Sequence, residues 1–293
     1  MDVRRLELLL ALSRLGSMHL VAETLGVTTS TVSQQIAALA KDVGTPLLEP
    51  DGRRVRLTPA GRRLAGHAVH IIAAHEAARA DLDPTAEPTG TVRIAAFHTA
   101  IRDSLLPVVP QLAAGHPDVR LEIQEQEPPE ALALLERDQV DLVLTYDYNL
   151  APASVDPAFE ATPLWETSWS LAVPSRSRRT TAKAADVFAA SAESDWIVNS
   201  RNTADGQVIR TVAALAGFEP RISQRADSLQ LVQEMIIAGL GVALLPAAYP
   251  KTTGVSLRRL RDPEPRMRAY AVTRRGRGGW APLSLLLDLL APR

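Results

Sequence analysis

The sequence predicts two domains: a small, mostly helical N-terminal domain that leads into a long helix, and a larger α/β domain behind it. The length of 293 residues is enough for about two domains. Apolar residues recur every three or four positions over residues 6–43 and again over residues 59–82, which is the spacing of amphipathic helices. From Thr91 onward short apolar segments alternate with helical ones, and this alternation is typical of a parallel α/β sheet.

The composition excludes several classes of protein. Apolar residues make up 46% and charged residues 22% of the chain, which is ordinary for a globular protein and unlike a disordered one. The chain has no cysteine, so a disulfide framework, a thiolate nucleophile and a cysteine-bound zinc are excluded. The first 63 residues hold nine basic and six acidic side chains, whereas the remainder holds 23 and 27. A basic front on an acidic body favours nucleic-acid binding by the N-terminal domain.

The first domain begins with three predicted helices. Leu6, Leu9 and Leu10 lie on one face of the first helix, which ends at Gly16. Ser17 is a suitable cap for a short second helix over residues 18–25, and Gly26 supplies the turn. Thr28 then caps a third helix that runs to about residue 43. Its apolar stripe consists of Val32, Ile36, Leu39 and Val43.

The outer face of the third helix is small, polar and free of acid. It carries Ser30, Ser33, Gln34, Ala37 and Lys41. Two helices joined by a glycine turn, the second with such a face, are typical of a helix-turn-helix whose second helix enters the major groove of DNA. An ordinary three-helix bundle with a solvated polar face remains the alternative on spacing alone.

A short hairpin and a long helix are predicted next. Residues 45–57 predict a two-stranded wing with a basic tip. Five arginines in the wing and shortly after it suit phosphate contacts: Arg53, Arg54, Arg56, Arg62 and Arg63. A solvated charge run, the alternative, would more often include acidic residues. Thr58 caps and Pro59 opens a helix over residues 59–82. Its apolar content, with Ile71 and Ile72 among the residues, predicts that it packs against a copy of itself.

The rest of the chain is predicted to alternate between strands and helices. Strands are expected at 92–97, 119–124, 141–145, 170–173, 196–198, 221–225 and 242–245, and helices at 100–114, 128–138, 205–216, 228–238 and 282–290.

The sequence contains few features that would indicate an enzyme or a membrane protein. His67, His70 and His75 lack a carboxylate or fourth ligand at metal-binding spacing, and the chain has neither G-x-S-x-G nor a Walker-type loop. Neither a cofactor nor a metal is therefore predicted. The near-apolar stretch 235–248 is shorter than the ~20 residues a bilayer requires. Glu7 interrupts the only leader-like segment, so we expect a cytoplasmic protein. A solute-binding protein with a chance helical bundle and an enzyme with turnover in a cleft are the rival interpretations.

The N-terminal motifs resemble a known family. The order G-S-x-x-x-x-A-E-x-L-x-V, V-S-Q-Q-I-x-A-L, G-T-P-L-L and G-R-R-V-R-L-T-P-A-G looks like the winged helix-turn-helix of LysR-type transcriptional regulators, over residues 1 to about 65. Thr29-Ser30 stands where the family usually has Gln-Pro, and Gln34 where an arginine is frequent. The resemblance implies a dimeric or tetrameric, sequence-specific DNA-binding regulator. The predicted DNA-contacting residues are Thr28, Thr29, Ser30, Thr31, Ser33, Gln34, Lys41, Arg53, Arg54 and Arg56.

The C-terminal part is similar to the effector-binding domain of that family, which resembles a two-lobed periplasmic binding protein. The motifs H-P-D-V-R-L-E-I, D-L-V-L and A-G-L-G-V-A-L-L-P carry this likeness. The implied organisation is a DNA-binding domain over 1–58, a dimerisation helix over 59–83, a linker over 84–90 and an effector-binding domain over 91–293. Lobe I is expected at about 91–162 and 268–293, and lobe II at about 163–267.

The resemblance further implies a small-molecule effector between the lobes, held by residues at strand ends and helix starts. In this sequence the predicted positions are His98, Thr99, Ala100, Tyr146, Asp147, Asn199, Arg201, Asn202, Thr203 and Ser228, with Phe97 and Asp227 in the same loops. Backbone N–H groups at Thr99 and Ala100 with Arg201 would favour a carboxylate, and Asp147 an amine. The sequence therefore suggests a zwitterionic effector, with a simple organic acid as the alternative.

Overall fold

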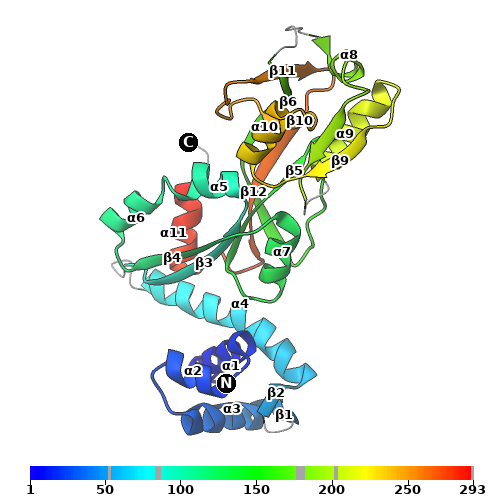
Figure 1. The fold of residues 1–293 in the computed structure, drawn as a ribbon. Helices are drawn as coiled ribbons and strands as arrows, with labels where there is room; N and C mark the ends of the chain where they lie inside the picture. Colours follow the sequence, from blue (N-terminus) through cyan, green and yellow to red (C-terminus); the bar gives the residue numbers. More distant parts are fainter. Residues whose placement is uncertain (52–53, 83–86, 176–181, 201–203, 292–293) are drawn as a thin grey trace.

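A computed structural model of the chain describes residues 1–51, 54–82, 87–175, 182–200 and 204–291. From one end to the other, the molecule has a helical head, a long helix α4 (Pro59–Leu82) and two stacked lobes (Figure 1). The head contains α1 (Val3–Leu15), α2 (Met18–Thr24), α3 (Thr29–Val43), β1 (Leu48–Asp51) and β2 (Arg54–Leu57).

The elements nearest the head form lobe I. They are β3 (Gly90–Ala96), α5 (His98–Ala100), the π-helical turn η1 (Ile101–Leu105), α6 (Val109–Gly115), β4 (Val119–Glu125), α7 (Pro128–Glu136), β5 (Leu142–Tyr148), β12 (Arg266–Arg274) and α11 (Ala281–Leu290). Lobe II contains β7 (Ala182–Lys183), α8 (Ala184–Ala189), β8 (Asp195–Val198), α9 (Ala204–Leu215), β9 (Arg221–Arg225), α10 (Leu229–Ile237), β10 (Ala243–Pro246) and β11 (Val255–Arg261). Strand β6 (Phe159–Pro174) belongs to both lobes.

The head has its own apolar core, built from the helix faces that the sequence predicts. Leu9, Val32, Ile36 and Leu39 are completely buried there. Helix α1 ends at Gly16 and α3 at Gly44, and both glycines adopt the left-handed conformation that closes a helix without a Cβ clash. Helix α4 completes this core with Ala65, Ala68, Val69 and Ile72, so half of the long helix is part of the head. The isoleucine at 72 thus packs within its own chain, which corrects the expectation that it contacts a second copy.

Two glycines of α4 provide a test of this packing. A Cβ on Gly61 would lie 2.3 Å from the carbonyl oxygen of Leu47, whereas a Cβ on Gly66 would meet no atom within 4 Å. We expect Gly61→Ala to destabilise the head by about 1–3 kcal/mol, because the backbone of the turn must shift. Gly66→Ala should stabilise it by about 0.5–1 kcal/mol, since alanine favours the helix. Differential scanning calorimetry of the full chain measures both, and equal effects would contradict the close approach at Gly61.

The main sheet is mixed, not parallel as expected. Its strand order is β4-β3-β5-β12-β6-β11-β7, with β10 paired to β6. Strand β3 is parallel to β4 and β5, but β12 runs antiparallel to both of its neighbours, β5 and β6. The strands over 255–261 and 266–274 were not predicted from the sequence. Their alternation of arginine with apolar residues gave no continuous apolar run of the kind expected for buried parallel strands.

Strand β6 connects the lobes. Its first part pairs with β12 in lobe I, and its last residues pair with β10 and β11 in lobe II. The two lobes therefore meet along a continuous strand, with the remaining elements of each lobe packed on either side of the junction (Figure 1).

One predicted helix is broken. The segment expected as a single helix over residues 100–114 forms α5, η1 and α6, with turns between Leu105 and Val109. Pro107 lacks the N–H group that a continuous helix would require there. The break leaves Thr99 at the start of a short helix that faces the other lobe.

The head also contacts lobe I directly. Arg14 of α1 donates from Nε to Asp138 Oδ2 at 2.9 Å, in the turn between α7 and β5. Asp141, which is buried, accepts from Arg93 and Arg277 beside it. Burial would raise the pKa of Asp141, but the hydrogen bonds from Arg93 and the positive charges of Arg93 and Arg277 together outweigh burial, so the pKa lies below its usual value. The junction between head and lobe is therefore an ionised network. None of the helices in the described ranges has the length and hydropathy needed to cross a membrane.

Candidate DNA-binding surface and interlobe pocket

Helix α3 lies on the side of the head away from the lobes (Figure 1), and one of its faces is polar and exposed. The exposed residues at helical spacing along this face are Thr29, Ser30, Ser33, Gln34, Ala37 and Lys41. The opposite side of the helix is held by the core and by Arg5 of α1, which donates to Gln35 at 3.1 Å and to Asp42 at 2.8 Å. The acid on α3 is thus paired with α1, and the outward face is uncharged except for Lys41.

Part of the predicted contact set stabilises the helix itself. Thr28 Oγ1 accepts from the Thr31 backbone N–H at 3.1 Å and lies 2.8 Å from the hydroxyls of Ser30 and Thr31. Thr28 is therefore the N-cap of α3, as expected, and its hydroxyl is already hydrogen-bonded. The face available to a major groove is centred on Ser33 and Gln34.

The wing flanks this helix. Strands β1 and β2 pair in antiparallel register, and Arg56 on β2 donates to Glu49 on β1 at 2.8 Å. Arg53 lies outside the described residues. For Arg54 the structure describes the backbone, which is part of β2, but not the side chain. Arg62 and Arg63 are exposed at the start of α4, and Arg62 donates to the Leu57 carbonyl. Among the described side chains of the wing, Arg56 is thus paired with an acid, and the exposed Arg62 and Arg63 belong to α4.

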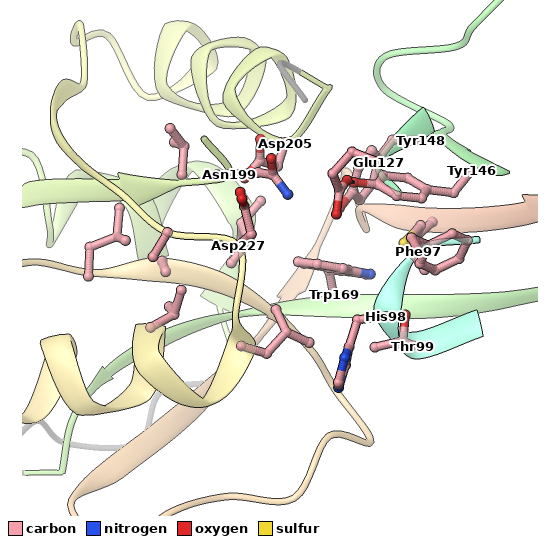
Figure 2. Close-up of a pocket in the computed structure, with 18 residues that line it drawn as sticks. Phe97, His98, Thr99, Glu127, Tyr146, Tyr148, Trp169, Asn199, Asp205 and Asp227 are labelled. Carbon is pink, nitrogen blue, oxygen red and sulfur yellow. Dashed lines mark hydrogen bonds between the residues drawn. The ribbon is translucent and has the colours of Figure 1, made fainter. Parts of the chain in front are cut away.

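A pocket lies between the two lobes. Figure 2 shows Phe97, His98, Thr99, Glu127, Tyr146 and Tyr148 of lobe I on one side, and Asn199, Asp205 and Asp227 of lobe II on the other, with Trp169 of β6 between them. Apolar residues of lobe II and Met267 complete the walls; they are Ile197, Val198, Ala226, Leu229, Val232, Ala243 and Leu244. The cavity between these side chains has a volume of about 60 Å³ and opens to solvent.

Several polar groups of the pocket are fixed by hydrogen bonds. Tyr146 donates from its hydroxyl to Glu127 Oε2 at 3.0 Å. Asp205 accepts from the backbone N–H of Asn199 at 2.7 Å, and Asp227 accepts from the backbone and hydroxyl of Ser200 at 2.7 Å. Burial raises the pKa of Asp205 to about 6, and the charge of Asp227 adds to this shift. Burial also raises the pKa of Tyr148 well above 10, so this phenol stays neutral.

The structure brings four of the predicted effector residues to the pocket: His98, Thr99, Tyr146 and Asn199. Phe97 and Asp227, from the same predicted loops, line it too. Arg201, Asn202 and Thr203 lie outside the described residues. Contact of any of these residues with an effector stays a prediction.

Three predicted residues lie elsewhere. Asp147 points to the other face of β5, where it accepts from Arg268 at 2.8 Å and from Tyr270 at 3.2 Å, so it adds no charge to this pocket. The direction follows from the alternation of side chains along a strand, which places Tyr146 and Tyr148 on the pocket side. Ala100 is completely buried in the core, and the Ser228 hydroxyl caps α10 by accepting from Leu231 N–H. The side chains of Asp147, Ala100 and Ser228 therefore do not line this pocket. Contact of an effector with the backbone N–H of Ala100, on which the expectation for that residue rested, stays a prediction.

Sequence reasoning missed Glu127, Tyr148, Trp169 and Asp205. Glu127 lies shortly after the end of β4, so the rule that ligands bind at strand ends could have identified it. Tyr148 was two positions from a predicted residue on the same strand, so the strand period gives it. Trp169 sits in the middle of the 16-residue strand β6, where no end rule applies.

Comparison with known proteins agrees with both parts of the structure. Residues 3–62 match the model of bacterial regulatory helix-turn-helix proteins of the lysR family, and residues 85–293 match the LysR substrate binding domain. The DNA-binding dual regulator OxyR of Escherichia coli K12 is 28% identical over 286 residues, covering 94% of this chain and 90% of that protein. The regulator ShiR of Corynebacterium glutamicum is 30% identical over 251 residues, covering 83% and 82%.

Solved structures share the fold along the whole chain. A cysteine variant of full-length OxyR from Pseudomonas aeruginosa superposes with a TM-score of 0.74 at 17% identity, covering 99% of this chain and 94% of that one. Full-length CbnR bound to its target DNA gives 0.53 at 20% identity, covering 99% and 98%.

The fold is that of a transcriptional regulator in which one chain carries both parts: a winged helix-turn-helix and, joined to it by a long helix, a two-lobed effector-binding domain. The chain belongs to the LysR family of DNA-binding transcriptional regulators. Its relatives are regulators of transcription and not enzymes.

Proposed function

We propose that a small molecule bound between the lobes controls how this regulator engages its operator. The observation that carries the proposal is the pocket itself, which is lined from both lobes and is crossed by β6, the strand common to both. A ligand held by both sides stabilises one lobe arrangement over another, and that difference in affinity is what shifts an equilibrium. We place this activity in the cytoplasm, where the DNA is.

The effector binds without a covalent thiol reaction. Several relatives are named for hydrogen peroxide, among them the probable hydrogen peroxide-inducible genes activator of Mycobacterium avium. Proteins commonly register peroxide by oxidation of a cysteine thiolate. These 293 residues include no cysteine, so we infer that this chain responds to a reversibly bound compound.

DNA recognition is assigned to α3 and the wing. Ser33 and Gln34 would reach base edges, because they are exposed at the centre of the polar face. Thr29, Ser30 and Lys41 would lie along the flanking backbone, with Arg53, Arg54 and Arg56 of the wing against phosphates. Thr28 and Thr31 contribute through the helix cap.

The active form is a homodimer or a dimer of dimers joined through α4. Its side chains Leu64, His67, Ile71, Ala74 and Ala78 recur at alternating intervals of three and four and are exposed or half-buried in the single chain. This spacing is that of a helix seam that packs against a partner helix. Two linked heads would then occupy two half-sites of the operator.

A ligand screen with two readouts tests the proposal. The full-length chain is heated with small acids, amino acids, amines, alcohols and sugars. A compound present at a hundred times its Kd raises the free energy of unfolding by about 2.7 kcal/mol. Each binder is then added to a complex of the chain with a duplex that it has itself selected from a random pool. We expect at least one binder to change the affinity for this duplex. The proposal would be overturned if none of the bound compounds changed the affinity of the chain for the selected duplex.

A further inference from the structure

The head and lobe I meet through an arginine of the head. Arg14, in the last turn of α1, donates from Nε to Asp138 Oδ2 at 2.9 Å, and its Nη2 lies 3.9 Å from Asp141 Oδ1. Among the described residues, Arg14 makes the hydrogen bond and the ion pairs between the head and lobe I. The orientation of the head on lobe I therefore depends in part on this side chain.

Lobe I pairs the same two carboxylates with arginines of its own. Asp141 lies 2.9 Å from Arg93 and 3.3 Å from Arg277. Asp138 lies 4.0 Å from Arg274. The ion pairs of the junction thus join four guanidinium groups to two carboxylates. If the head moves away, both carboxylates keep a cationic partner within lobe I.

The junction does not satisfy all of its guanidinium groups. Nη2 of Arg14 and Nε of Arg277 are buried and have no hydrogen-bond partner among the described residues. Arg277 is 6% exposed, and burial lowers its pKa, an effect to which the charge of Arg14 adds. A buried donor without a partner is unfavourable, and more so on a charged group. Water would satisfy the Arg14 side chain outside the junction, so the attraction to Asp138 is offset by these costs.

The turn between α7 and β5 is held by lobe I itself. Arg274 donates there to the carbonyl oxygens of Leu135 and Glu136. Arg93 donates to the carbonyl oxygen of Asp138 at 3.4 Å. The head is likewise held by its own apolar core. Separation of the two surfaces therefore requires neither of them to unfold.

Helix α4 touches the same region of lobe I. A Cβ on Gly276, in the turn after β12, would lie 3.1 Å from Nδ1 of His70 on α4. This helix runs between the head and lobe I (Figure 1). If Arg14 is released, α4 is the attachment that remains, and the head can turn about it.

One helix–turn–strand unit connects the junction with the interlobe pocket. Helix α7 begins directly after the pocket residue Glu127 and ends before the turn that contains Asp138. Strand β5 begins directly after Asp141 and carries Tyr146 and Tyr148 to the pocket. A shift of this unit would move both carboxylates relative to the head.

We propose that Arg14 and Asp138 form a reversible latch between the head and lobe I. The closed latch fixes the head on the lobe, and the open latch lets the head turn about α4. The latch goes beyond the proposed function, because it names the contact through which lobe I controls the head. Two heads of a dimer must match two half-sites, so closed latches favour one half-site spacing and open latches accept several.

Distance measurements test whether the latch holds the head. The chain has no cysteine, so Thr24→Cys in the head and Ala114→Cys in lobe I place two spin labels at exposed positions. Labelled chain is mixed with unlabelled chain in large excess, so that a dimer contains labels on one chain. Double electron–electron resonance should give a narrow distance distribution, because the latch is closed. A broad distribution in this background would overturn the proposal.

Variants on both sides of the junction should release the head. Arg14→Gln removes the cation, and Asp138→Asn removes the acid while asparagine tolerates the φ of 58° at this position. We expect both to broaden the distance distribution. The matched control Arg5→Gln removes an arginine of the same helix whose partner, Asp42, lies within the head, and it should keep the narrow distribution. Circular dichroism confirms that each variant is folded. The latch is disproved if both junction variants retain the narrow distribution or if Arg5→Gln broadens it equally.

A DNA measurement tests what the latch does. The wild-type chain selects a duplex from a random pool, and a second duplex has a few base pairs inserted between the half-sites. We expect the insertion to weaken wild-type and Arg5→Gln binding about tenfold or more, and Arg14→Gln binding by about threefold or less, since only a released head can follow a displaced half-site. Equal losses for wild type and Arg14→Gln would overturn the control of spacing. An unchanged DNA affinity with every bound compound would instead reject the proposed function, and the distance distributions would still decide the latch.

Discussion

Gln34→Glu is expected to abolish sequence-specific DNA binding. Gln34 is exposed at the centre of the α3 face that we assign to the major groove. Loss of a base-edge hydrogen bond costs about 1–3 kcal/mol, or roughly 5- to 150-fold in affinity, and the new carboxylate adds repulsion from DNA. Affinity for a duplex selected by the wild-type chain should therefore fall by about two orders of magnitude or more.

The adjacent residue provides a matched control. Gln35 accepts from Arg5 at 3.1 Å on the side of α3 that faces α1. Gln35→Glu makes the same change of charge one position along the chain, but the new carboxylate lies beside a guanidinium. We expect it to retain affinity within a few-fold, because an ion pair of this kind contributes about 0.2–1 kcal/mol. Fluorescence anisotropy with the selected duplex and with a random duplex of equal length measures both variants. Equal losses would show that α3 does not enter the groove by this face.

Ile71→Asp is expected to separate the dimer without unfolding the head. Ile71 is half-buried at the edge of the head core, and it lies on the α4 face whose residues recur at intervals of three and four. A partner helix would therefore bury the new carboxylate. An unpaired buried charge costs several kcal/mol. Light scattering should show a monomer, and DNA affinity should fall by about two orders of magnitude or more, because linked heads gain about 10²–10⁴ from binding together.

The neighbouring isoleucine separates assembly from folding. Ile72 is 7% exposed and packs in the core of its own head. Ile72→Asp should therefore lower the melting temperature of the head strongly, since removal of a buried isoleucine alone costs about 2–5 kcal/mol. Ile71→Asp should change that temperature far less. If Ile71→Asp remains dimeric and binds DNA as the wild type does, the α4 face is not the dimer contact.

The sequence by itself determined the head and the class of the second domain. Local signals suffice there: Gly16 ends α1 because it adopts a left-handed conformation, and Thr28 starts α3 because its hydroxyl accepts a free N–H. The 3.6-residue period of Val32, Ile36 and Leu39 then identifies the buried face of α3, and its opposite face follows.

Tertiary structure decided everything that depends on pairing between distant segments. The antiparallel insertion of β12 between β5 and β6 joins residues about a hundred or more positions apart, and nothing local in Arg266–Arg274 indicates its neighbours. Because β12 pairs with β5, Asp147 contacts Arg268 on one face of β5. Tyr146 and Tyr148 lie on the opposite face and line the pocket. Trp169 and Asp205 enter the pocket because two lobes meet, and Ile72 turns to the head because α4 packs there. A sequence period tells which side chains share a face, but only the packed chain decides what that face contacts.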